Sequence, residues 1–404
     1  MLLWFRTGRG GIMKHAIVFP GQVWQYPRIG YELYESEKRY KDIIDYANSL
    51  LTFDLKEKCF SDSVISDTKY VQPIIFVTCY ALYRLFEEKY NLLSLPTFFA
   101  GHSLGEYTAL TVAGALEFEE ALALVEKRGQ CMAIECESGK MGAVIGMRKN
   151  RIEEICKEVT DSYNYVYISN YNSLYQSVIA GTETAFIEAC KKIKNEKGRT
   201  KELNVSNAFH TKMMTNAANN FSKALDGCKI SLPQVSVISN VTGEVYKNVD
   251  EIRELLKEQM TKPVQWVHTM QTMEHNGVTH IFEISPKSVL SPFFKQTISK
   301  VMTLQFYGEK TYCIVTKNTE EICDYIRKVL VTNKSNNIQA KEYNQNVICF
   351  YKELGRKTTD YPVDLLFDRS KKALISKGCC DSKLLNGIRM KIIENIDELR
   401  EGFT

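Results

Sequence analysis

The chain of 404 residues has little net charge and no long apolar run, and each absence excludes a class of protein. Lysine and arginine number 52 and aspartate and glutamate 48, which leaves a formal charge of only +4. That balance gives no electrostatic argument for a dedicated nucleic-acid binder. No apolar stretch approaches the roughly 20 residues of a membrane-spanning helix, and the apolar start Met1 to Phe5 is too short for a signal peptide. We therefore expect a cytoplasmic protein without a nucleic-acid or membrane partner.

Patterns for metal sites and disulfide frameworks are also missing. The 12 cysteines include no two Cys-x-x-Cys pairs at the spacing of a zinc site, and no two of the 6 histidines flank an acid at helical zinc spacing. Disulfide-stapled folds are typical of short secreted chains. We interpret the cysteines as reduced and mostly buried thiols, and we expect neither a metal nor a cofactor.

Short apolar runs alternate with helical patterns in the first part of the chain. Strands are expected at 15–19 and 97–100, and helices at about 70–90, 106–116 and 118–136. Such alternation is typical of an α/β fold with a mainly parallel sheet. We expect a large subdomain like that of the α/β-hydrolases, formed by residues 14–138 and 206–310, with further strands at 235–239 and 279–284 and a helix at 249–259.

Residues 139–205 carry a pattern of their own. Strands are expected at 143–147, 165–169, 177–180 and 201–205, and helices at 151–159 and 184–194. The order βαββαβ is that of the ferredoxin-like unit. We therefore predict a small ferredoxin-like subdomain inserted into the large one, followed by a C-terminal extension, 311–404, to which the sequence assigns no role.

A candidate nucleophile lies between the second expected strand and the helix after it. Gly101-His-Ser-Leu-Gly105 fits the pattern G-x-S-x-G, in which a sharp turn exposes the serine hydroxyl at a helix N-terminus. The N–H of Leu104 would then point at the oxygen of an acyl group on Ser103. The plain alternative is a chance match in a loop, and the flanking strand and helix argue against it.

A serine nucleophile needs a base, and His210 is the best candidate. It follows the end of an expected strand, where catalytic loops collect. A core or surface histidine is the ordinary alternative. His102, beside the serine, is expected to be structural, and the stretch that holds the remaining candidates is polar and expected to be exposed: His268, His275 and His280.

Eight motifs then occur in one order and together are far more specific than any one of them. Through them the chain, from about His15 to Leu304, resembles the malonyl-CoA:acyl carrier protein transacylases and the acyltransferase domains of polyketide synthases. The motifs are Phe19-Pro-Gly-Gln22, Gly101-His-Ser-Leu-Gly-Glu106, Arg128-Gly129, Val178-Ile-Ala-Gly181, Val205-Ser-Asn-Ala-Phe-His210, Ser239-Asn-Val-Thr-Gly243, Pro263-Val-Gln-Trp266 and Glu283-Ile-Ser-Pro286.

The resemblance implies an acyltransferase that moves a malonyl group from malonyl-CoA to the phosphopantetheine thiol of an acyl carrier protein. Ser103 would carry the group as an ester, with His210 as base. Gln259 matches the position whose neutral carbonyl orients the histidine. Gln22 matches the residue whose backbone N–H joins that of Leu104 as an oxyanion donor.

Three residues are implied on the substrate side of the site. Arg128 matches the arginine that holds the free malonyl carboxylate, which a guanidinium can do with two parallel hydrogen bonds. Without the resemblance, a solvated helix residue is the simpler interpretation. Phe209 matches a ring that crowds an α-methyl branch and so favours malonyl over methylmalonyl. His102 is placed beside them.

Departures from the family pattern keep other functions open. Gly21-Gln-Val-Trp-Gln25 replaces Gly-Gln-Gly-Ser-Gln, and Trp24 motivates an acyl hydrolase that clears stalled acyl groups from carrier proteins. Arg128 argues against it, because an uncharged acyl chain has no use for a guanidinium. A non-catalytic docking subunit is a third hypothesis, against which Ser103 and His210 argue. Since no ketosynthase or carrier signature is present, we expect a monomer that acts in trans in polyketide or fatty-acid synthesis.

Overall fold

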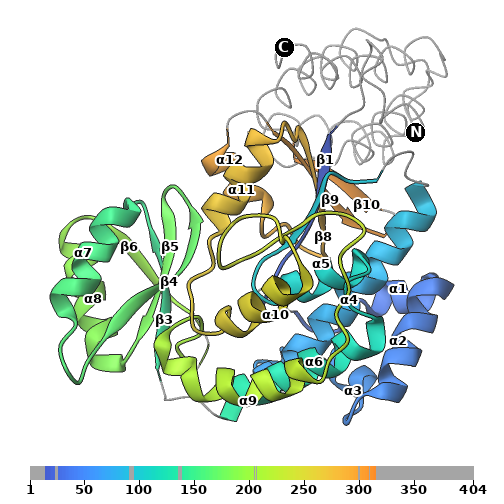
Figure 1. The fold of residues 1–404 in the computed structure, drawn as a ribbon, viewed down its shortest axis with the longest axis horizontal. Helices are drawn as coiled ribbons and strands as arrows, with labels where there is room; N and C mark the ends of the chain where they lie inside the picture. Colours follow the sequence, from blue (N-terminus) through green and yellow to red (C-terminus); the bar gives the residue numbers. More distant parts are fainter. Residues whose placement is uncertain are drawn as a thin grey trace, which may run out of the picture. The chain divides into compact units, whose positions relative to one another are not determined.

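The computed structural model describes residues 14–22, 26–90, 95–134, 139–203, 205, 207–298, 301–308 and 310–314. Of these, the residues up to 301 belong to one compact unit and residues 302–314 to another. The predicted α/β class is confirmed, because the first unit combines a parallel sheet with a separate small antiparallel sheet (Figure 1).

The parallel sheet of the first unit has the strand order β8-β1-β2-β7. Its strands are β8 (His280–Ile284), β1 (His15–Phe19), β2 (Phe98–Gly101) and β7 (Val237–Ile238), each parallel to its neighbours. All of their residues are buried, as expected for parallel strands covered on both faces. The register pairs Phe19 with Gly101, so the segments that follow β1 and β2 leave the sheet at the same edge.

Alternating side chains of β1 face different layers of helices. Ala16 and Val18 belong to a core shared with Trp266 and Met270 of helix α11 (Trp266–His275). Phe19, whose side chain points to the opposite face from Val18, meets the ring of Tyr83 on helix α4 (Thr68–Tyr90) edge-on, with centroids 5.9 Å apart. The helices of this unit outside the small sheet are α1 (Tyr31–Ser36), α2 (Lys38–Leu50), α3 (Leu55–Cys59), α4 (Thr68–Tyr90), α5 (Gly105–Val112), α6 (Phe118–Ile134), α9 (Thr215–Asp226), α10 (Val249–Glu258), α11 (Trp266–His275) and α12 (Ser291–Thr297), with a 3₁₀ turn at Lys212–Met214.

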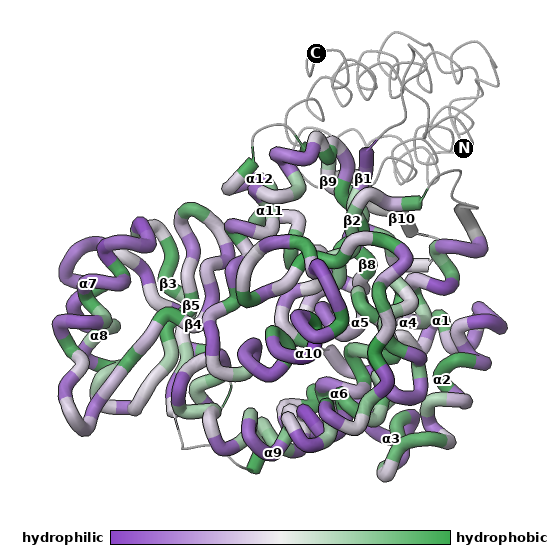
Figure 2. The backbone as a smooth tube through the Cα atoms, viewed as in Figure 1, coloured by the Kyte–Doolittle hydropathy of each residue, from purple (hydrophilic) through white to green (hydrophobic). Residues whose placement is uncertain are grey.

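The small sheet has the order β4-β5-β3-β6 and is antiparallel throughout. Its elements follow in the predicted order: β3 (Lys140–Ile145), α7 (Lys149–Val159), β4 (Val166–Ser173), β5 (Gln176–Gly181), α8 (Glu183–Asn195) and β6 (Arg199–Glu202). The last strand lies earlier than the expected 201–205. Along α7 and α8, hydrophobic residues alternate with hydrophilic ones (Figure 2), and the hydrophobic ones pack on the sheet in one core.

An edge of the small sheet is hydrogen-bonded to the segment before α11. Asn170 of β4 forms a parallel bridge with Val264, in which Tyr171 N–H donates to Val264 O and Val264 N–H donates to Ser169 O, each at 2.9 Å. This bridge ties the two parts of the unit together.

In the second unit, β9 (Met302–Tyr307) and β10 (Lys310–Ile314) form an antiparallel pair that the sequence did not predict. The rest of the expected extension lies outside the described residues. Among the helices that the structure describes, none has both the length and the hydropathy needed to cross a bilayer.

Candidate active site

The turn between β2 and α5 presents Ser103 in a strained conformation. Its φ of 52° lies in the left-handed region, which residues other than glycine rarely occupy. Glycine is required on both sides of this turn, because there is no room for a Cβ atom. A Cβ on Gly101 would lie 1.9 Å from the backbone of Gly105, and one on Gly105 would lie 2.1 Å from the carbonyl oxygen of Phe19. The chain therefore turns sharply under Ser103.

Asn240, in the loop after β7, holds this turn from behind. Its Oδ1 accepts a hydrogen bond from Ser103 N–H at 2.5 Å, and its Nδ2 donates to the carbonyl of Gly101 at 2.6 Å. Asn240 is fully buried, and its hydrogen bond to Gly101 is buried as well. In the sequence analysis Asn240 appeared only as a member of a motif, without a role.

Ser103, His210 and Gln259 form a hydrogen-bonded chain. The Oγ of Ser103 lies 2.7 Å from Nε2 of His210, and Nδ1 of His210 lies 2.7 Å from the backbone carbonyl of Gln259. A carbonyl can only accept, so Nδ1 carries the proton and Nε2 is free to accept from the serine. Burial, followed by the positive charge of Arg128, lowers the pKa of His210 to about 3. The imidazole is therefore neutral near pH 7 and able to take a proton.

Arg128, on α6, reaches the same serine oxygen from another direction. It is 1% exposed, and its Nη2 donates to Ser103 Oγ at 3.2 Å and to Gln259 Oε1 at 3.0 Å. Its Nη1 donates to Gln72 Oε1 at 2.6 Å, and its Cζ lies 5.4 Å from the centre of the Tyr107 ring. Among the described residues, no carboxylate forms an ion pair with it and its Nε has no hydrogen-bond partner. The guanidinium is thus a buried cation with capacity to bind an anion.

The other predicted residues lie around this centre. Leu104 is buried at the start of α5. Gln22 accepts a hydrogen bond from Thr68 at 3.1 Å, and a Cβ on the preceding Gly21 would lie 2.7 Å from the carbonyl of His102. The loop after β1 therefore runs against the serine turn. Val23 and Trp24 lie outside the described residues.

His102 and Phe209 complete the predicted set. Nε2 of His102 lies 2.9 Å from Oδ1 of Asn172 on β4, and its ring meets Trp266 edge-on at 5.5 Å. Burial lowers the pKa of His102 to about 4. Phe209 is buried next to His210. His102 therefore links the serine turn to the small sheet.

Glu106, which the sequence analysis named only as the end of a motif, lies fully buried behind the serine. Its carboxylate accepts hydrogen bonds from Asn240 N–H at 3.0 Å, Tyr246 O–H at 2.5 Å and Gln259 Nε2 at 2.5 Å. Burial raises the pKa of Glu106 to about 7, against these hydrogen bonds and the charge of Arg128, which lower it. Only contacts between distant parts of the chain reveal this residue.

The expectation that the remaining histidines are exposed is wrong for one of them. His268 and His275 are exposed on α11, whereas His280 is 5% exposed because it begins the interior strand β8. In the part of the chain that the structure describes, no group of three or more metal-ligating side chains comes together.

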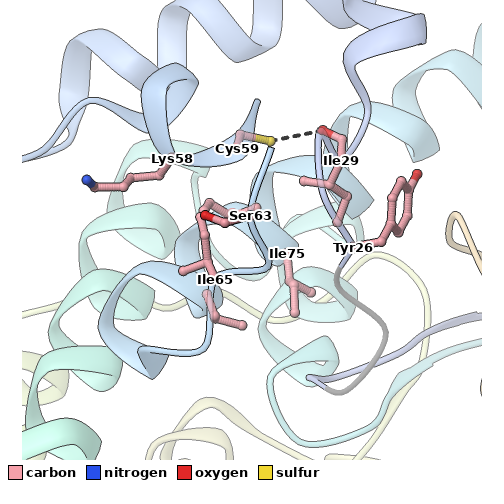
Figure 3. Close-up of a pocket in the computed structure, with 9 residues that line it drawn as sticks. Tyr26, Ile29, Lys58, Cys59, Ser63, Ile65 and Ile75 are labelled. Atoms are coloured by element: carbon pink, nitrogen blue, oxygen red, sulfur yellow. Dashed lines mark hydrogen bonds between the residues drawn. The ribbon is translucent and has the colours of Figure 1, made fainter. Parts of the chain in front are cut away.

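Of two hollows in the described part of the chain, one includes His210 of the site and the other includes none of the site residues. A groove of about 430 Å³ includes His210 and runs between the 3₁₀ turn after it and α7 and β4 of the small sheet. A second hollow, between the segment before α1 and helices α3 and α4, has a volume of about 10 Å³ and is lined by Tyr26, Ile29 and Cys59 among others (Figure 3). That is about the space of one water molecule, and there the thiol of Cys59 donates to the carbonyl of Ile29 at 3.0 Å. The second hollow is too small for an acyl group.

Comparisons of the sequence with known proteins all match acyltransferases or polyketide biosynthesis proteins. Residues 16–342 match the family model described as acyl transferase domain. The chain is 34% identical over 314 residues to a malonyl CoA-acyl carrier protein transacylase of Bacillus subtilis, covering 76% of this chain and 98% of that protein. It is 36% identical to the polyketide biosynthesis protein ThaF of Burkholderia thailandensis, covering 71% of this chain but only 24% of that longer protein.

Solved structures give the same picture. The malonyl CoA-acyl carrier protein transacylase of Coxiella burnetii superposes with a TM-score of 0.69 at 34% identity, over 72% of this chain and 93% of that one. A malonyl-transacylase solved in complex with a type II polyketide synthase acyl-carrier protein superposes with a TM-score of 0.69 at 31% identity, over 72% of this chain and 96% of that one.

Proposed function

Because the chain belongs to the family of acyl transferase domains, we propose that it moves a malonyl group from malonyl-CoA to the phosphopantetheine thiol of an acyl carrier protein. One observation carries the proposal. The oxygen of Ser103 lies 2.7 Å from a neutral imidazole and 3.2 Å from a buried guanidinium. A nucleophile, its base and a cation that can bind a carboxylate therefore lie together. A malonyl group needs this arrangement, because its free carboxylate is only one methylene away from the carbonyl that the serine attacks.

In the first half-reaction His210 takes the hydroxyl proton as Ser103 attacks the thioester carbonyl. The developing oxyanion would be held by backbone N–H groups of Leu104 and Gln22. When the intermediate collapses, the C–S bond breaks and His210 returns the proton to the departing thiolate of coenzyme A. The malonyl group remains on Ser103 as an ester.

Arg128 plays two parts in this step. Its guanidinium holds the malonyl carboxylate, one methylene away from the carbonyl under attack. The carboxylate also offsets the positive charge that lowers the pKa of His210. Malonyl binding thus makes the imidazole a stronger base, and an acyl group without a carboxylate lacks this effect.

In the second half-reaction the carrier's thiol takes the place of the serine hydroxyl. His210 removes the thiol proton, the sulfur attacks the malonyl ester, and the proton passes to Ser103 Oγ as the C–O bond breaks. The groove that includes His210 is also lined by three lysines and one carboxylate: Lys157, Lys212, Lys262 and Glu153. The lysine charges would attract an acidic carrier protein.

We further propose that the enzyme is a cytoplasmic monomer that serves its carriers in trans, in polyketide or fatty-acid synthesis. In this proposal the large subdomain comprises 14–138 and 206–310, the ferredoxin-like insert 139–205, and the extension 311–404. Phe209 would narrow the acyl pocket and favour malonyl over methylmalonyl.

Labelled malonyl-CoA and a phosphopantetheinylated carrier protein test the function. The protein should acquire one malonyl group and pass it to the carrier, and Ser103→Ala should abolish both events. Release of free malonate in place of carrier loading would identify a hydrolase. If Ser103 acquired neither a malonyl group nor a fluorophosphonate, the proposal would fail in favour of a docking protein.

A further inference from the structure

The carboxylate of Glu106 is buried one helical turn from the nucleophile and is used by no step above. Every hydrogen bond that it makes is one that it accepts. Asn240 N–H and the Tyr246 hydroxyl donate to Oε1, and Gln259 Nε2 donates to Oε2. It therefore lies behind the reacting atoms and acts through the groups that donate to it.

The side-chain amide of Gln259 has two unlike ends, and Glu106 and the Ser103 carbonyl together determine which end faces the site. The NH₂ end donates to Glu106 Oε2 at 2.5 Å and to the carbonyl of Ser103 at 3.0 Å, and both of these atoms only accept. The oxygen end is consequently turned toward Arg128, whose Nη2 donates to it at 3.0 Å. A reversed amide would point its NH₂ group at the guanidinium.

We propose that Glu106 is a positioning residue for malonyl capture: by only accepting hydrogen bonds it fixes the orientation of the Gln259 amide, which in turn holds Arg128 over the nucleophile. This inference rests on the proposed function, because it concerns how the carboxylate of the cargo is bound. Glu106 itself touches neither cargo nor the reacting atoms.

The isosteric change Glu106→Gln separates this role from simple filling of space. A glutamine at this position has one accepting and one donating end. The donating end must face either the Asn240 backbone N–H or Gln259 Nε2, and both of those groups donate. The backbone N–H cannot turn, whereas the Gln259 amide can reverse, with the loss of its hydrogen bond to the Ser103 carbonyl, and present its NH₂ group to Arg128. The change therefore acts on Arg128 although the volume is conserved.

Protonation of Glu106 should mimic that change. Burial raises the pKa of Glu106 to about 7, while hydrogen bonds from Tyr246, Gln259 and Asn240 and the charge of Arg128 lower it. Two phenols also interact with the charge of Glu106, and burial raises the pKa of both Tyr107 and Tyr246, so that both stay neutral. Below this pH the carboxyl gains a proton that it can donate, and the constraint that Glu106 places on Gln259 is lost.

A matched control exists elsewhere in the chain. Glu283, on β8, is also fully buried and accepts hydrogen bonds from the backbone of Val289, Leu290 and Ser291. None of these contacts involves the groups around Ser103. Glu283→Gln therefore measures the general effect of neutralising a buried carboxylate, and Glu106→Gln measures that effect plus any action on Arg128.

The experiment measures acylation of Ser103 by malonyl-CoA and by acetyl-CoA, whose acyl group has no carboxylate. Glu106→Gln should raise KM for malonyl-CoA by about 10- to 100-fold, the loss typical of a displaced charged hydrogen bond, with a smaller effect on acetyl-CoA. Glu283→Gln should leave the ratio of malonyl to acetyl transfer as it is in the wild type. If Glu106→Gln also left that ratio unchanged while the wild type accepted malonyl, the inference alone would be overturned. A wild type that takes no malonyl group would overturn the proposed function and the inference together.

Tyr246→Phe keeps the test decisive if Glu106→Gln does not fold. It removes one hydrogen bond that lowers the pKa of Glu106 and leaves the carboxylate in place. The acid limb of kcat/KM for malonyl-CoA should then move to higher pH than in the wild type. A limb that does not move would contradict the inference, since a purely structural tyrosine would change the rate at all pH values alike.

Discussion

At the scale of single residues, the hydroxyl of Ser103 lies between two groups of opposite effect. His210 must accept its proton, yet Arg128 holds a positive charge close enough to disfavour a charged imidazole. The conflict is useful for selectivity, because only a cargo with its own carboxylate neutralises the cation. In the proposed mechanism the site would thus combine recognition of the free carboxylate with activation of the base.

Arg128→Ala should remove the preference for malonyl. We expect malonyl acylation of Ser103 to fall by at least about 100-fold, since a buried charge-assisted pair is lost, and acyl groups without a carboxylate to be accepted more readily. Arg128→Lys should recover only part of the malonyl rate, because an ammonium cannot form two parallel hydrogen bonds. Mass spectrometry of the acyl-enzyme after exposure to mixed acyl-CoAs measures both.

Arg151→Ala provides the control for loss of an arginine. Arg151 forms exposed ion pairs with Glu154, Glu158 and Glu196, and surface pairs of this kind contribute little. Its removal should leave the acyl profile unchanged. An unchanged profile in Arg128→Ala as well would show that another group holds the carboxylate.

Arg128→Met should raise the pKa of His210 from about 3, because it removes a nearby positive charge while burial, the larger cause, remains. The lowered pKa of His210 also makes the stability of the fold depend on pH. In the unfolded chain His210 has an ordinary pKa of about 6.5, so between pH 6.5 and 3 it binds a proton that the folded protein does not bind. The free energy of unfolding therefore falls as the pH drops from 6.5 toward 3. The variant should show a smaller fall over this range. An NMR titration of the His210 ring checks the pKa, and one that gave equal values in both proteins would refute the electrostatic account of the base.

At the scale of elements, the turn between β2 and α5 depends on glycines at both ends. In Gly105→Ala the new Cβ would lie 2.1 Å from the carbonyl oxygen of Phe19, so β1 or α5 must move. We expect a loss of about 1–3 kcal/mol of unfolding free energy, as for an overpacked core, and a larger relative loss of acylation because Ser103 shifts from His210. Thermal unfolding and the rate of acylation measure the two effects.

Gly227→Ala is the matched control for that substitution. Gly227 caps the end of α9 with a negative φ, and a Cβ there would meet only the carbonyl of Ala224, at 3.7 Å. Stability should stay within about 0.5 kcal/mol of the wild type or rise slightly. If Gly105→Ala were equally harmless, close packing would not be what requires glycine in the turn.

The sequence predicted some elements better than others, for physical reasons. β1 was predicted at its observed bounds because a buried parallel strand is an uninterrupted apolar run ended by Pro20-Gly21. α11 was missed although its buried residues Trp266, Met270 and Met273 recur at i, i+4 and i+7, which is helical spacing. β9 and β10 were missed as well, although Gly308, with a φ of 63°, lies in the turn between them.

Some residues of the site could likewise be predicted from the sequence and others could not. Ser103 could be predicted from local spacing, because the glycines that make the turn are its neighbours in sequence. Arg128 and Gln259 required the family resemblance, since no local pattern distinguishes them from ordinary helix residues. The role of Glu106 could not be predicted at all, because its partners Asn240 and Gln259 lie 134 and 153 residues away.

At the scale of the molecule, the site forms along one edge of the parallel sheet. The segments after β1, β2 and β7 contribute Gly21, Ser103 and Asn240, which follow the carboxyl ends of adjacent parallel strands. Ligand sites of open α/β sheets form at this edge. The small sheet adds Asn172, which holds His102 beside the serine. The site therefore draws on both sheets of the first unit.

This arrangement predicts which part of the chain acylation needs. All site residues lie between Gly21 and Gln259, the family match ends at residue 342, and 314 aligned residues account for 98% of the Bacillus subtilis relative. A chain that ends after residue 342 should therefore take a malonyl group from malonyl-CoA at a rate within about twofold of the full chain, since none of the groups that stabilise the transition state is removed. Carrier loading by the same truncated chain then reports whether residues 343–404 serve the partner. A truncated chain that unfolds like the wild type but no longer forms the acyl-serine would place part of the extension in the catalytic site.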